Sequence, residues 1–260
     1  MRDLVVPTIF VIICVLTIWL GIAGSFFADA QMQDTYVFIK DFQTLIAACI
    51  AVAAAGIAWW NTTRTIRHAA QLERQRRARK QAALRAVLPH ALSAVSNYAE
   101  QSDKALQPLH AACEDGLLHH NNIAAPKIGK LDTETVTLLK DFIEYSEHSE
   151  ANLIEKMLAH IQIHHSRMKG LAEKIKAGPN DSTGANWVEQ LILDAACTYA
   201  WAGAAYDYAR RRTDALPEDI TWDNVRSALN NLRMGDDEEI RELREHIDRL
   251  EQAGAKPGTT

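Results

Sequence analysis

Signatures of catalysis and of cofactor binding are missing from this sequence. It has no glycine-rich phosphate loop, no Gly-x-Ser-x-Gly elbow and no Ser/His/Asp ordering of the hydrolase type. No residue can therefore be named as catalytic or cofactor-binding, and we expect no cofactor and no small-molecule substrate. A non-enzymatic role is the first expectation.

Cysteine is scarce, with four among 260 residues, and none forms a CxxC pair or a Cys/His spacing of the zinc type. Cys14 and Cys49 lie in apolar runs, whereas Cys113 and Cys197 stand alone. This pattern indicates buried or free thiols. For Cys113 and Cys197 it agrees with a reducing cytosol.

Charge is absent from two long stretches, residues 4–27 and 42–60. An uncharged helix of about 24 residues is roughly 36 Å long, enough to cross a hydrocarbon core of about 30 Å. A cleaved signal peptide is the alternative for the first stretch, because Ala28-Asp29-Ala30 resembles a cleavage site, but the apolar run is too long and its leader only weakly positive. We predict a transmembrane hairpin over residues 1–62, with spans at about 4–27 and 40–60 and a short outside loop at 28–39.

Positive charge is concentrated directly after the second span. Residues 61–88 carry eight Lys or Arg against one acidic residue, and residues 89–260 carry eighteen against twenty-eight. Lys and Arg beside a span mark its cytoplasmic side, and aromatic residues gather at the interface. We therefore expect a protein integral to the cytoplasmic (inner) membrane with both termini in the cytoplasm. The residues expected at the membrane surface are Trp59, Trp60, Arg64 and Arg67.

Small residues recur every four positions in both predicted spans, at Gly21 and Ser25 and at Ala47, Ala51 and Ala55. Such faces let helices approach closely in lipid. They predict contact between the two spans of one chain, self-association of neighbouring hairpins, or both. The charge-free runs 4–27 and 42–60 have no charged residue that could serve an ion or proton pathway.

Residues 63–88 are predicted to form a basic juxtamembrane helix. Its charges project on all sides at 100° per residue, which favours a stalk through solvent over a helix lying on the membrane. Nucleic-acid binding is disfavoured because the segment adjoins a span, lacks interleaved aromatics and belongs to an acidic chain. Pro89 predicts a kink or a new helix.

Apolar residues at helical spacing predict a cytoplasmic α-helical bundle over residues 89–252, so the fold class is all-α. Residues 113–130 are expected to form a loop, with a helix starting after Asp132 or Thr133 and another after an N-cap at Thr221. Ser149 is a possible further N-cap. The Gly, Pro and Thr content of residues 253–260 predicts a disordered tail.

A seam of coiled-coil type runs through the bundle region. Ile154, Ile161, Met168 and Ile175 repeat every seven residues, with His164 and Leu171 at alternate positions. A shorter stripe runs from Ile240 to Leu250. These seams predict either self-association or packing within one bundle. Replacing the polar His164 by leucine is expected to raise stability.

His160 and His164 are weak metal candidates because they lie four residues apart on one helix face. The His-Glu-x-x-His order of zinc proteases is missing, so we favour His164 in the seam and His160 on a solvated flank. The leading hypothesis is a non-enzymatic membrane protein that presents a helical interaction or scaffold domain to itself or to a protein partner. The alternatives are a membrane-perturbing or signal-relaying effector that oligomerises, and a histidine- or metal-dependent enzyme.

Overall fold

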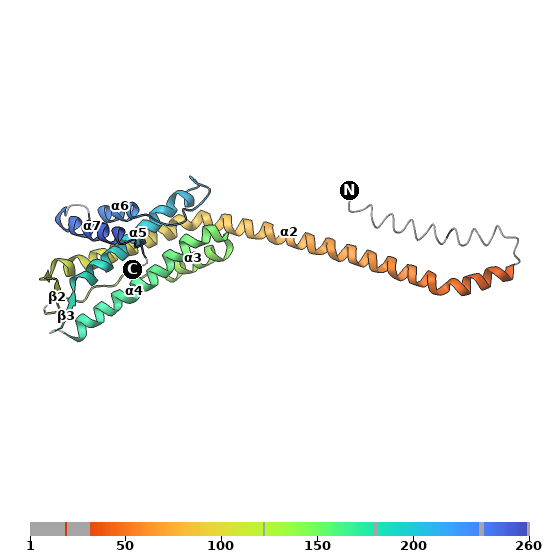
Figure 1. The fold of residues 1–260 in the computed structure, drawn as a ribbon, viewed down its shortest axis with the longest axis horizontal. Coiled ribbons are helices and arrows are strands. Elements are labelled where there is room, and N and C mark those ends of the chain that lie inside the picture. The colour runs from red at the N-terminus through yellow and green to blue at the C-terminus, as the bar shows by residue number, and fades with distance from the viewer. Residues whose placement is uncertain (1–18, 20–31, 122, 179–180, 234–236, 259–260) are drawn as a thin grey trace. The chain divides into compact units, whose positions relative to one another are not determined.

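The computed structural model describes residues 19, 32–121, 123–178, 181–233 and 237–258. These residues are mostly helical, which confirms the predicted all-α class (Figure 1). The helices are α2 (Met32–Ala111), α3 (Thr133–Tyr145), α4 (His148–Ala177), α5 (Ala185–Ala209), α6 (Trp222–Leu232) and α7 (Asp237–Gln252). Contacts divide the chain into two compact units, Met1–Arg76 and Arg77–Thr260.

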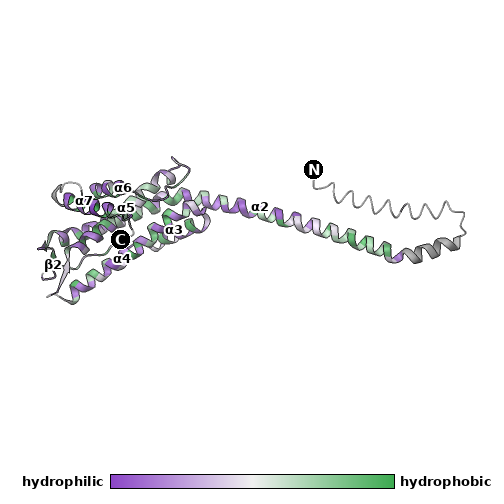
Figure 2. Cartoon of the chain, viewed as in Figure 1, coloured by the Kyte–Doolittle hydropathy of each residue, from purple (hydrophilic) through white to green (hydrophobic). Residues whose placement is uncertain are grey.

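The first unit contains the apolar part of α2. One helix among the described residues is long and apolar enough to cross a membrane: an 18-residue window in Gln43–Ala111 has a mean hydropathy of 1.7, and none of it is buried. Figure 2 shows this hydrophobic stretch, followed along α2 by a hydrophilic one. The first predicted span, with Gly21 and Ser25, lies outside the described residues apart from Trp19. One candidate span is therefore shown, and the hairpin stays a prediction.

Helix α2 does not end at Pro89. Both Pro89 and Pro108 lie inside it, so of the two alternatives predicted for Pro89, a kink or a new helix, the new helix is wrong. A proline inside a helix lacks one N–H and removes a hydrogen bond. Leu88 and Leu92, on either side of Pro89, are fully buried in the core, and their packing offsets that loss. The bundle also begins before residue 89, because Leu84 already packs against its core.

Two helix starts agree with the sequence. The carboxylate of Asp132 accepts a hydrogen bond from the Thr135 amide at 2.6 Å and caps α3. Thr221 caps α6 in a reciprocal capping box with Asn224. Helix α4 instead begins one residue before Ser149, and its N-cap residue Glu147 makes no side-chain capping bond.

The second unit packs its helices around one hydrophobic core. Helix α4 contacts α3 and α5, α5 also contacts α6, and α6 contacts α7. The whole predicted seam of α4 is buried in this core: Ile154, Ile161, His164, Met168, Leu171 and Ile175. Ile240, Leu243 and Ile247 of α7 are buried as well. Both seams therefore pack within the chain, which removes the reason for expecting them to pair between chains.

A small antiparallel sheet replaces part of the loop expected at residues 113–130. β1 (Cys113–Glu114) pairs with β2 (Leu117–His119), which pairs with β3 (Ser182–Gly184). The turn between β1 and β2 uses positive φ angles at Asp115 and Gly116. His120 reinforces this join, with Nδ1 3.0 Å from the Gly178 carbonyl oxygen and Nε2 2.9 Å from the Thr183 hydroxyl. The sheet thus ties the segment after α2 to the segment between α4 and α5.

The end of the described chain lies on the bundle. The indole N–H of Trp222 donates to the Ala255 carbonyl at 3.0 Å, and Ala255 packs against the core. For residues 253–258 this arrangement differs from the disorder expected from their composition; residues 259 and 260 lie outside the described residues. The glycine and proline content of a segment indicates its local flexibility, but it does not indicate which part of the folded protein the segment contacts.

Candidate functional site

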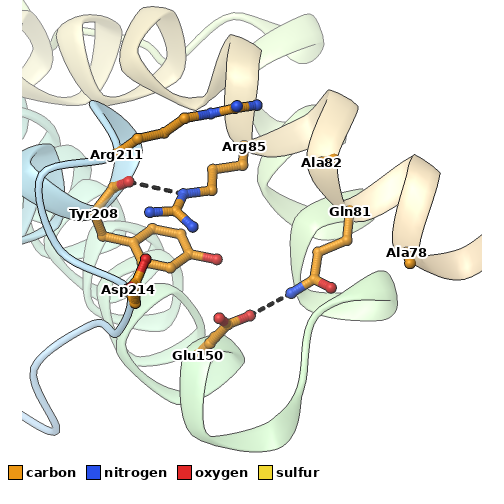
Figure 3. Close-up of a pocket in the computed structure, with 8 residues that line it drawn as sticks. All are labelled: Ala78, Gln81, Ala82, Arg85, Glu150, Tyr208, Arg211 and Asp214. Carbon is orange, nitrogen blue, oxygen red and sulfur yellow. Dashed lines mark hydrogen bonds between the residues drawn. The ribbon is translucent and has the colours of Figure 1, made fainter.

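An open hollow of about 400 Å³ lies in the second unit, between α2, the start of α4 and the end of α5. Its lining residues are Ala78, Gln81, Ala82, Arg85, Glu150, Tyr208, Arg211 and Asp214. Figure 3 shows that α2 contributes one face of the hollow and that Tyr208 lies opposite Gln81. The two alanines leave room on that face because their side chains are short.

Arg85 closes one end of this hollow. Its Nε donates to the Tyr208 carbonyl at 2.9 Å and its Nη2 to the Thr213 carbonyl at 2.5 Å. The guanidinium also lies 3.9 Å from the centre of the Tyr208 ring. The last carbonyls of a helix lack partners within it and attract positive charge. Arg85 therefore fastens the end of α5 and the loop after it to α2.

Tyr208, Glu150 and Gln81 form the polar wall. The Gln81 amide donates to Glu150 Oε2 at 2.5 Å. Burial, and next the negative charge of Glu150, raise the pKa of Tyr208 to about 12, so the phenol keeps its proton at neutral pH. The hollow lies between α2, α4 and α5. Its volume and its polar lining would suit a small polar molecule.

His164 lies in the core with one polar partner. Its Nδ1 is 2.9 Å from the hydroxyl of Tyr98, and the two rings meet edge to face with centroids 5.7 Å apart. Burial, and next the charge of His160, lower the pKa of His164 to about 3. The seam position of His164 is buried, and nothing in the sequence indicated Tyr98 as its partner.

His160 is buried, so its expected place on a solvated flank is wrong. Its Nε2 lies 3.0 Å from the Asp194 carbonyl oxygen, and its ring packs against that of Trp201 with the two ring centroids 4.8 Å apart. The Asp194 carboxylate, 1% exposed, accepts hydrogen bonds from Arg167 and Gln190, each at 3.0 Å. The face of α4 that carries His160 is covered because α5 packs on it.

The two weak metal candidates gain no third ligand in the structure. Across the part of the chain that is described, no three His, Cys, Asp or Glu side chains lie together as a metal site would require. His160 and His164 both direct a ring nitrogen to a protein oxygen. Their geometry serves packing between α2, α4 and α5.

The residues predicted at the membrane surface, and the helix-packing residues predicted for the second span, lie on α2. Trp59 is 78% exposed, Trp60 is half-buried, and Arg64 and Arg67 are exposed. The small residues Ala47, Ala51 and Ala55 are also exposed. Their expected contact with the first span falls outside the described residues and stays a prediction.

Nothing in the sequence indicated one buried ion pair, between Asp103 and Arg233. Arg233 Nε lies 3.0 Å from Asp103 Oδ1, and both side chains are 1% exposed. The residues are far apart in the sequence, and no spacing or motif connects them. The pair ties the end of α6 to α2.

No protein-family model matches this chain, and no match was found among the curated proteins or the solved structures.

Proposed function

We propose that this protein is a non-enzymatic membrane anchor that presents a helical interaction domain in the cytoplasm. One observation carries the proposal: the apolar window of α2 has no buried residue, while the unit from Arg77 onward has a complete core of its own. Exposed apolar surface of this extent is typical of a membrane or protein contact. Its length suits a bilayer.

The orientation is part of the proposal and rests on charge. Arg64 and Arg67 follow the apolar window directly, and both are exposed. Such residues stay on the cytoplasmic side of a span. The unit from Arg77 onward then lies in the cytoplasm, and a hairpin with the first apolar run places the N-terminus there too.

The partner is proposed to be membrane lipid together with a protein. The exposed stripe of Ala47, Ala51 and Ala55 is a surface on which another helix can pack closely. That helix is the first span of the same chain or a span of a second copy. We therefore propose that any self-association occurs through the stripe of Ala47, Ala51 and Ala55 on α2, because the seams of the bundle are buried within the chain.

Membrane insertion is tested with one charge placed at two positions. Ile50 of α2 is 61% exposed and Ile163 of α4 is 51% exposed. Arginine at the centre of a span costs about 2.5–3.5 kcal/mol. We expect the wild-type chain and Ile163→Arg to stay in membranes washed with alkaline carbonate, and Ile50→Arg to be lost from them. Release of the wild-type chain by carbonate would overturn the proposal.

The orientation is tested with a reporter fused after Thr260. We expect protease to spare the reporter on intact cells and to cleave it in inverted vesicles. Cleavage on intact cells would contradict the cytoplasmic placement. It would leave the insertion result standing, so the two parts of the proposal fail separately.

A further inference from the structure

The segment 253–258, here called the C-terminal strap, turns back onto the bundle after α7. The Gly254 amide bonds the Glu251 carbonyl at 2.9 Å, and the Ala255 amide bonds the Leu250 carbonyl at 3.0 Å. Gly254 has a φ of 74°, which glycine adopts without strain at a helix end. The helix end therefore aims the following residues at the bundle.

Two tryptophans contact the strap. The indole N–H of Trp222, on α6, donates to the Ala255 carbonyl at 3.0 Å. Gly258 lies directly on the indole of Trp201, on α5: a Cβ added there would overlap the ring, lying 2.9 Å from Cζ2 and 3.1 Å from Cζ3. Trp201 is 3% exposed and Trp222 is 7% exposed. One tryptophan thus binds a backbone carbonyl, and the other accepts only a residue without a side chain.

The surface beneath the strap is buried and joins two helices. Cys197 lies one turn before Trp201 on α5 and is 3% exposed. The Gly258 backbone hydrogen-bonds its thiol, while burial raises the pKa of that thiol. His160 of α4 packs against the Trp201 ring, so the surface continues into the core.

We propose that Cys197, Trp201 and Trp222 form a binding surface for a glycine-containing peptide, and that the chain's own residues 253–258 occupy it as an intramolecular latch. This surface recognises peptide backbone through the Trp222 N–H, and it selects glycine because the Trp201 ring fills the space of a side chain. Tethering raises the local concentration of the strap to about the millimolar range. The latch therefore stays closed until it is displaced.

The first test uses two glycines of equal backbone geometry. Gly254 and Gly258 both have a φ of 74°, but an added Cβ meets nothing within 4 Å at Gly254 and the Trp201 ring at Gly258. Gly258→Ala and Gly254→Ala carry the same backbone strain, so only the first adds a clash. We expect Gly258→Ala to raise the alkylation rate of Cys197 at least tenfold above that of Gly254→Ala. Cys113, on β1, serves as the reference thiol in the same digest.

The second test offers the strap as a separate molecule. In detergent, the chain shortened to end at Gln252 is mixed with a synthetic peptide of residues 253–260. We expect saturable binding that protects Cys197 from alkylation, no protection by the Gly258→Ala peptide, and at least tenfold weaker binding to the full chain. Equal Cys197 rates in the two glycine variants, or a folded shortened chain that ignores the peptide, would overturn the latch. The glycine pair decides alone if the shortened chain loses its helical circular dichroism.

Discussion

The hydroxyl of Tyr98 on α2 lies 2.9 Å from Nδ1 of His164 on α4, and both side chains are buried. A polar residue in an apolar seam thus has a partner on another helix. Leucine at position 164 would remove a desolvation cost but would leave the phenol without this partner. An unsatisfied buried group costs about 1–3 kcal/mol, so we reverse the expectation that His164→Leu raises stability.

A double-mutant cycle measures the Tyr98–His164 bond. We expect Tyr98→Phe and His164→Leu each to lower the free energy of unfolding of the bundle by about 1–3 kcal/mol. The double variant should lose less than the sum, because each single change already breaks the same bond. Urea unfolding followed by circular dichroism gives all three values. Strict additivity would show that the two groups do not interact.

We expect the stability of the bundle to depend on pH because of the same histidine, His164. Its pKa is lowered from 6.5 in the unfolded chain to about 3 in the folded one, mainly by burial. The unfolded state therefore binds more protons between these values, so the stability that the neutral ring contributes is complete above pH 6.5 and is lost as the pH falls toward 3. Urea midpoints from pH 7.5 to 4 should fall more steeply for the wild type than for His164→Leu, which cannot titrate. Parallel profiles would contradict the buried, neutral state.

Arg85 is expected to stabilise the bundle through its two carbonyl partners. Arg85→Ala should cost about 1.5–3 kcal/mol because it removes charged hydrogen bonds at the end of α5. Arg85→Lys should recover only part of this, since an ammonium cannot reproduce the planar fork over Tyr208. Arg79→Ala on the exposed surface of the same helix is the matched control and should change stability by less than about 0.5 kcal/mol. Equal effects at both arginines would refute the role of Arg85.

The buried pair of Asp103 and Arg233 gives a fourth prediction. Arg233→Met alone should cost about 3–5 kcal/mol, because it leaves a buried carboxylate without its main counter-charge. Adding Asp103→Leu should restore much of that loss, since the buried carboxylate disappears as well. Thermal unfolding of the single and double variants makes the comparison. A double variant less stable than Arg233→Met would contradict the view that the buried carboxylate causes the loss.

Local patterns in the sequence determined the elements that short-range physics controls. Charge-free runs and the basic residues after Trp60 indicated the apolar part of α2, and the capping residues Asp132 and Thr221 fixed two helix starts. The heptad residues from Ile154 to Ile175 lie on a face of α4 that is buried. Each of these features depends on neighbours a few residues away, so it can be seen in one segment.

Only the tertiary structure decided which surfaces meet. The heptad face of α4 could have paired with another chain, but helices of the same chain cover it, and His160 is buried because α5 lies over it. Pro89 remains inside a helix because the core packs on both sides of it, and residues 253–258 are ordered because Trp201 and Trp222 receive them. Composition sets what a segment can adopt alone, whereas contacts between residues far apart in the chain decide what it adopts in the fold.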